Sequence, residues 1–201
     1  MSKLFPLAIC VAASTLAGSL ASAQAVVSID PTTQTTSTGS VVTVDVAISN
    51  VSNLYAYQFD LSFNPNILQA VSSSEGPFLA GGGSTFFIPG TNDNLAGTVF
   101  ATADTLLAPI SGVNGSGELA VFTFDAIGAG TSTFSIQNEI LLNSGLNIVS
   151  DLTKTGFVTV KTPTVAAPEI DPASTMAALT LLLGGLAVLR GRRTLRISTI
   201  C

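Results

Sequence analysis

Four acidic residues are the first candidates for chemistry in this sequence of 201 residues: Asp60, Asp93, Asp104 and Glu118. Two paired carboxyl groups can hydrolyse a glycosidic bond, one as acid and the other as base or nucleophile. Nothing in the spacing pairs these four, and acids in strands and turns are usually solvated. The sequence contains no His, which excludes the usual Ser-His-Asp triads. We therefore predict that the protein is not an enzyme.

Metal binding has one candidate segment, Asn92, Asp93 and Asn94, whose side chains carry the oxygen ligands that Ca²⁺ prefers. The segment lacks the longer spacing of a calcium loop, so we interpret it as a plain Asn/Asp turn. The two cysteines, Cys10 and Cys201, lie near opposite ends and indicate no disulfide framework or zinc cluster. No metal or cofactor is expected.

Binding surfaces are also limited by composition. The sequence has no Trp, the ring that sugar-binding platforms commonly use. Tyr55 and Tyr57 share a strand face with Phe59, which favours packing in the core. Phe86 and Phe87 are adjacent, so they point to opposite faces and one is expected to be exposed. Seven basic residues against twelve acidic ones exclude nucleic acid as a partner.

The middle of the chain must position these residues, and its hydrophobic period is two. Apolar residues alternate with polar ones over residues 42–48, 55–63, 120–125 and 133–137. This alternation predicts strands with one buried face, and helical spacing is absent. Turn residues punctuate the runs, for example at 38–39, 64–66, 81–83, 114–117 and 128–130. Residues 24–161 are therefore predicted to form an all-β, two-sheet sandwich.

The order of segments in this middle part resembles the cohesin domain family. The resemblance is carried by residues 39–46, 50–54, 59–68, 117–124, 128–132 and 156–160. It implies a jelly-roll β-sandwich of about nine strands. It also implies binding of dockerin modules through one flat sheet face, whose outer positions here correspond to Ala56, Gln58 and Asp60. Only part of the family's polar pattern is present at these positions.

Outward polar positions of the predicted strands suggest where a partner would bind. They are Thr43, Asp45, Gln58, Asp60 and Ser62. A flat polar face suits protein docking, and a merely solvated face is the alternative. We predict a non-catalytic binding module at the cell surface or in extracellular matrix, with a dockerin-like protein as partner. The alternatives are a carbohydrate-binding module associated with exopolysaccharide and a structural matrix protein without a specific ligand.

The first 23 residues are typical of a secretory signal peptide. Lys3 precedes a mostly apolar run over residues 4–20. Ala21 and Ala23 form a small-x-small cleavage site, which places the start of the mature chain at Gln24. A retained membrane anchor is the alternative.

The last 40 residues have three parts. Residues 162–172 form a Pro-rich linker, and the uncharged residues 173–189 are predicted to be a transmembrane helix rather than a buried core helix. Residues 190–201 are predicted to be a basic cytoplasmic tail, because basic residues at the end of an apolar span mark that side. The parts carry a motif and an Arg cluster: Pro168, Glu169, Ile170, Asp171, Pro172, Arg190, Arg192 and Arg193.

This order of motif, span and Arg cluster resembles the PEP-CTERM sorting signal of Gram-negative bacteria. The family has Pro where this sequence has Ile170, and here a short tail follows the cluster. The resemblance implies processing by the membrane protease exosortase. It implies a protein that crosses the inner membrane, is anchored transiently in it, and ends at the cell surface or in extracellular matrix.

Overall fold

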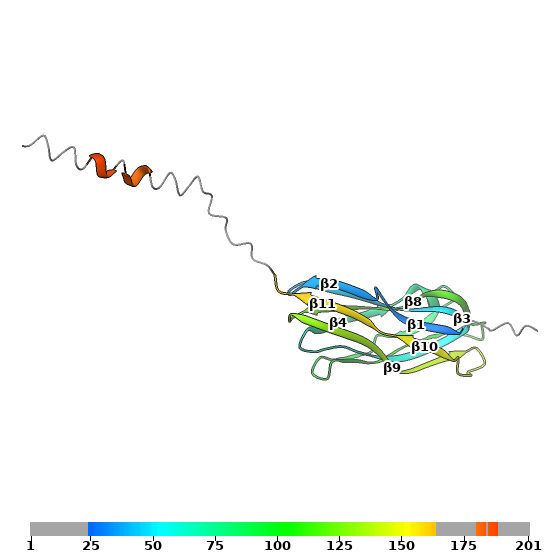
Figure 1. The fold of residues 1–201 in the computed structure, drawn as a ribbon. Coiled ribbons are helices and arrows are strands. Elements are labelled where there is room, and N and C mark those ends of the chain that lie inside the picture. The colour runs from blue at the N-terminus through cyan, green and yellow to red at the C-terminus, as the bar shows by residue number, and fades with distance from the viewer. Residues whose placement is uncertain (1–23, 164–179, 184, 189–201) are drawn as a thin grey trace, which may run out of the picture. The chain divides into compact units, whose positions relative to one another are not determined.

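The alternating runs of the sequence form strands in the computed structural model, which describes residues 24–163, 180–183 and 185–188. Residues 24–163 contain eleven strands and one four-residue helix (Figure 1). The elements are β1 (Ala25–Asp30), β2 (Thr33–Ser37), β3 (Val41–Ser62), β4 (Leu68–Glu75), α1 (Pro77–Ala80), β5 (Thr85–Ile88), β6 (Thr91–Asp93), β7 (Thr98–Leu106), β8 (Val113–Ala126), β9 (Gly130–Asn143), β10 (Asp151–Lys154) and β11 (Gly156–Lys161). The all-β prediction is confirmed, and the strand count exceeds the nine that the resemblance implies.

Strand β3 is one continuous strand that belongs to both layers of the sandwich. Its first half pairs with β1 and β8, and its second half pairs with β7 and β9. Between the halves, Asn50 and Asn53 have positive φ angles of 57° and 60°. Asn tolerates this left-handed conformation better than most residues do. The chain can therefore shift its pairing register and pass from one layer to the other.

The two layers follow from this pairing. One layer contains β10, β1, the first half of β3, β8 and β4. The other contains β5 and β6 beside β7, then the second half of β3, then β9. The first part of β9 pairs with β11, which also pairs with β2 in parallel.

The core lies between the layers and is rich in phenylalanine. Phe59 and Phe122 approach each other from the two layers with ring centroids 6.1 Å apart. Phe124 of β8 contacts Phe63 and Phe134 at 5.1 Å each. Burying one such side chain contributes about 1.5–3 kcal/mol. A shared aromatic core of this kind holds the two layers in a fixed relation.

One short element has no signal in the sequence, and one local expectation is wrong. Residues 77–80 form the helix α1, because Pro77 suits a first helical position and Leu79 is fully buried. Four residues are too few to show helical periodicity. Residues 114–117 were expected to form a turn, but they belong to the start of β8. There the Asn114 side chain accepts a hydrogen bond from the Asn53 backbone N–H at 2.9 Å. That contact ties β8 to the crossing of β3.

The predicted ends lie mostly outside the described residues. These include the signal peptide 1–23 with Ala21 and Ala23, the motif at 168–172, and Arg190, Arg192 and Arg193. Residues 180–183 and 185–188 have helical backbone. Within the described part of the chain, no helix has both the length and the apolar character needed to cross a membrane.

Candidate functional site

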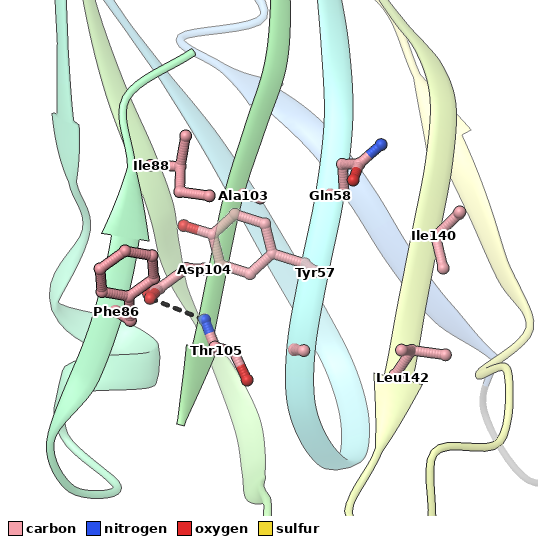
Figure 2. Close-up of a pocket in the computed structure, with 10 residues that line it drawn as sticks. Tyr57, Gln58, Phe86, Ile88, Ala103, Asp104, Thr105, Ile140 and Leu142 are labelled. Atoms are coloured by element: carbon pink, nitrogen blue, oxygen red, sulfur yellow. Dashed lines mark hydrogen bonds between the residues drawn. The ribbon is translucent and has the colours of Figure 1, made fainter. Parts of the chain in front are cut away.

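The outer surface of β5, β7, β3 and β9 carries an apolar depression of about 260 Å³. Figure 2 shows the four strands side by side, with side chains from each. In register, Gln58 of β3 lies opposite Ala103 of β7 and Ile140 of β9, and Ala103 lies opposite Ile88 of β5. We call this surface the apolar face; its residues are Ala56, Gln58, Phe86, Ile88, Ala103, Thr105, Ile140 and Leu142.

The apolar face is exposed although its side chains are hydrophobic. Phe86 is 59% exposed, and Ile88 and Ile140 are 44% exposed each. Ala56 and Ala103 have small side chains at the middle, which leaves the hollow between the larger residues. Contiguous exposed apolar patches on soluble proteins mark interaction sites, whereas single exposed apolar residues are common. Strand alternation explains it, because the opposite side of each strand faces the core.

The five polar residues predicted to form one binding face do not lie together. Thr43 and Asp45 are on the first half of β3, opposite Thr123 and Val121 of β8. Gln58, Asp60 and Ser62 are on the second half, which pairs with β7 and β9 in the other layer. Of the five, the structure places only Gln58 on the apolar face.

Asp45 is half-buried rather than freely solvated. Burial raises the pKa of its carboxyl group, and the nearby Glu118 and Asp30 raise it further. Ser62 Oγ lies 2.6 Å from Ser135 Oγ and is also part-buried. The Ser62 contact ties that residue to β9, whereas among the described residues Asp45 Oδ1 is buried and has no hydrogen-bond partner.

Asp60 is a buried clamp between strands, not a contact residue, with only 8% of its surface exposed. Its Oδ1 accepts a hydrogen bond from the Ala101 backbone N–H at 2.8 Å, and its Oδ2 accepts one from Asn138 Nδ2 at 2.7 Å. Ala101 and Asn138 have positive φ angles of 54° and 49°. Both pairings of β3 shift register at this point, so Asp60 holds two β-bulges that border the apolar face.

A second buried acid, Asp104, lies behind the apolar face. It is 2% exposed, and its Oδ1 accepts a hydrogen bond from the Thr105 backbone N–H at 2.8 Å (Figure 2). Burial raises the pKa of Asp104 to about 7, and the carboxyl group of Glu75 adds to the shift. The expectation that these acids are solvated is therefore wrong for Asp60 and Asp104. Asp104 could have been found from the sequence, since it alternates with Leu106 at an inward position.

The Asn92–Asn94 segment is a turn only in part, because Asn92 and Asp93 end strand β6 and the turn begins at Asn94. Asp93 Oδ1 accepts hydrogen bonds from the backbone N–H groups of Leu95 and Ala96 at 3.0 and 2.9 Å. The Asn94 side chain bonds both the N–H and the C=O of Ala70 on β4. It thereby covers part of the free edge of that strand. Across the described residues, no three His, Cys, Asp or Glu side chains are grouped so that they could hold a metal ion.

The predictions for the aromatic residues are confirmed. Tyr57 is 2% exposed and its ring stacks on Phe59 at 5.7 Å. Tyr55 packs against the core, and its hydroxyl donates to the Ala108 carbonyl. Phe86 points outward while Phe87 packs against the core. The tyrosines support the sandwich from inside, and Phe86 alone of the four belongs to the apolar face.

Comparisons with known proteins give one family. A family model described as the cohesin domain matches residues 25–160. A non-cellulosomal cohesin from the archaeon Archaeoglobus fulgidus is 16% identical with a TM-score of 0.54, covering 73% of this chain and 94% of its own. No curated protein sequence matches.

Several similar structures contain a dockerin, among them the following two. One is the sixth cohesin of scaffoldin B from Acetivibrio cellulolyticus, solved in complex with a dockerin. It is 19% identical with a TM-score of 0.56, and the match covers 69% of this chain and 100% of that one. The other is a type I cohesin–dockerin complex from Clostridium thermocellum, at 12% identity and a TM-score of 0.58, covering 69% and 99%.

Proposed function

The chain belongs to the cohesin domain family, and we propose that it is a non-catalytic module that binds a dockerin-type protein through the apolar face. The observation that carries this proposal is the exposed apolar surface of β5, β7, β3 and β9. Similar structures were solved with dockerins bound, which supports the choice of partner. The fold supplies the scaffold, and the surface residues supply the site.

The chemistry of the apolar face defines the partner that fits it. Large side chains at its sides and alanines at its middle suit a complementary apolar ridge, such as an aliphatic helix face. Gln58 and Thr105 are its polar side chains and can orient the partner through hydrogen bonds. Interface cores are depleted in charge and rich in aromatic and aliphatic groups, as this surface is. The two acids near it, Asp60 and Asp104, are only 8% and 2% exposed, so they offer little carboxylate surface to the partner.

A binding titration with matched variants tests the proposal. Solved relatives are covered over 94–100% of their own length, so the domain is a complete folding unit and residues 24–163 can be purified alone. We expect calorimetry to detect binding to a dockerin from the same organism. Ile140→Lys should weaken it about 30-fold or more, because a central contact contributes about 2 kcal/mol.

Val41→Lys is the matched control. Val41 is an exposed aliphatic residue on the first half of β3, so the substitution is alike in chemistry but lies on the other layer. It should leave the dissociation constant within twofold of the wild type. Equal losses in both variants would contradict the assignment of the apolar face. Binding to a polysaccharide array together with no dockerin binding would favour the carbohydrate-binding alternative.

We also propose that the two ends deliver the domain to the cell surface. The support is the sequence alone: the apolar N-terminal run with Ala21 and Ala23, the motif at 168–172, and the Arg cluster after residue 189. Deleting residues 168–201 should release the domain to the periplasm or the medium. A deletion product that still fractionates with membranes would contradict this role of the tail.

A further inference from the structure

Two carboxyl groups meet behind the apolar face, one from each layer. Asp104 lies on β7 opposite Tyr57 of β3 and Phe87 of β5. Glu75 ends β4 in the other layer, and its Oε1 accepts a hydrogen bond from Thr85 Oγ1 of β5 at 2.5 Å. Thr85 and Phe87 of β5 lie opposite Leu106 and Asp104 of β7, so the Glu75 carboxyl group lies near that of Asp104 and raises its pKa. The pair therefore connects β4 to the β5–β7 edge that carries Phe86 and Ile88.

The Asp104 carboxyl group lacks a donor for one of its oxygens. Among the described residues, Asp104 Oδ2 is buried and has no hydrogen-bond partner. Leaving such an atom unsatisfied is costly when the group is ionised. The hydroxyl of Tyr57 cannot supply the missing donor, because it already donates to the Leu119 carbonyl.

Basic side chains cannot neutralise the pair either. The sequence has no Lys, Arg or His between residues 4 and 153, and the domain's two lysines, Lys154 and Lys161, lie on β10 and β11. Two carboxylates in one buried site repel each other, so one of them retains a proton. A proton on either carboxyl group creates the donor that Asp104 Oδ2 lacks.

We propose that Asp104 and Glu75 share one proton in the folded domain, and that its loss at alkaline pH loosens β5 and β7 and weakens binding at the apolar face. The weakened binding rests on the proposed function, whereas the shared proton concerns the domain alone.

The electrostatic environment supports the same conclusion. The pKa of Asp104 is raised to about 7, first by burial and then by Glu75. The other titratable groups on neighbouring strands are Asp45, Tyr55, Tyr57 and Asp60 on β3, Asp93 on β6, and Glu118 and Asp125 on β8; α1 and β5 contribute none. The Asp93 carboxyl binds its own turn, and Glu118 is exposed. Because the folded form holds its proton more tightly than the unfolded chain, stability falls as pH rises from about 4 towards 7.

Tyrosine fluorescence gives a local test. The sequence contains two tyrosines and no Trp, so Tyr55→Phe leaves Tyr57 as the single reporter beside the pair. We expect the emission of Tyr57 to change in one step with a midpoint near pH 7, because an ionised carboxylate alters a neighbouring phenol. Asp104→Asn, which keeps the shape and donates to Glu75 without titrating, should abolish the step. Asp125→Asn, at an exposed acid on β8, should retain it.

A second variant keeps the test possible if the first does not fold. If Asp104→Asn does not fold, Glu75→Gln supplies the same neutral donor from the other side and should also abolish the step. A step that survives in a folded Asp104→Asn or Glu75→Gln protein would overturn the proposal. A midpoint that moves on adding Ca²⁺ or EDTA would also overturn it, because a cation rather than a proton would then hold the pair.

The pH dependence of dockerin binding is measured separately. Dockerin affinity should fall at least threefold between pH 6 and pH 8.5 in the wild type, and this pH dependence should disappear in Asp104→Asn. A pH-independent affinity in the wild type would overturn the coupling to the apolar face. If no dockerin binds at any pH, the proposed function fails, while the fluorescence step still decides whether the proton is shared.

Discussion

Replacing Asp60 by alanine should destabilise the domain far more than replacing its outward neighbour on the same strand. Asp60 receives hydrogen bonds from the Ala101 backbone N–H and from Asn138 Nδ2, at 2.8 and 2.7 Å. Both donors belong to residues with positive φ angles in β-bulges of β7 and β9. Removing the carboxylate leaves both strained residues without the group that holds them.

The magnitude follows from these two contacts. A hydrogen bond to a charged group contributes about 1.5–3 kcal/mol when buried. Ala101 and Asn138 are exposed residues, so water replaces part of what is lost, and the expected cost is about 2–3 kcal/mol. A domain of this size unfolds with an entropy of about 0.3 kcal/mol/K. The melting temperature should therefore fall by about 7–10 °C.

Differential scanning calorimetry of the 24–163 domain measures this shift. Gln58→Ala is the control, because Gln58 is exposed on the same strand and should change stability by less than about 0.5 kcal/mol. Combining Asp60→Ala with Asn138→Ala should show a coupling energy of about 1 kcal/mol. A melting temperature for Asp60→Ala within 2 °C of the wild type, or equal effects of Asp60→Ala and Gln58→Ala, would refute the role of Asp60 as a clamp.

Three further substitutions probe other parts of the fold. Burial and Asp151 raise the pKa of Glu139 to about 8, so the stability of the domain should fall as pH rises from about 4.5 to 8. Glu139→Gln should reduce that fall in urea titrations, and an unchanged pH profile in this variant would contradict the role of Glu139. Gly97→Ala should lower the free energy of unfolding by more than about 2 kcal/mol in the same assay, because the φ angle of Gly97 is +72° and a Cβ would lie 2.4 Å from the Phe63 carbonyl oxygen. An unchanged stability would refute this packing. Asn94→Ala should uncover the edge of β4 and speed aggregation in light scattering, and equal rates would show that the edge is covered by other groups.

Local pattern predicted the strands and the direction of most side chains correctly. The alternation places Tyr57 inward, and it separates Phe86 from Phe87. These outcomes depend on the period of a single strand and on little else. The turn at Asp93 was equally predictable, because Asp side chains bond the backbone two or three residues ahead.

The binding face was not predictable in the same way, because it depends on which strands become neighbours. Even-numbered residues 42–48 are buried in the first half of β3, and odd-numbered residues 57–61 are buried in the second half. This change of phase is visible in the sequence. It does not show that one strand crosses between layers, so Thr43 and Gln58 seemed to share a face. Asp60 was misjudged for a related reason, since its donors come from bulges 41 and 78 positions away.

The scarcity of basic residues connects the stability of this domain to the properties of its binding face. Residues 24–161 contain ten acids and two lysines, so buried carboxyl groups cannot rely on ion pairs. Asp60 is satisfied by backbone and amide donors that the fold itself provides, whereas Asp104 lacks one donor and depends on a proton from solvent. Added salt screens exposed ion pairs but acts weakly on buried groups. The stability of the β5–β7 edge should therefore respond strongly to pH and little to ionic strength, unlike that of a domain held together by surface salt bridges.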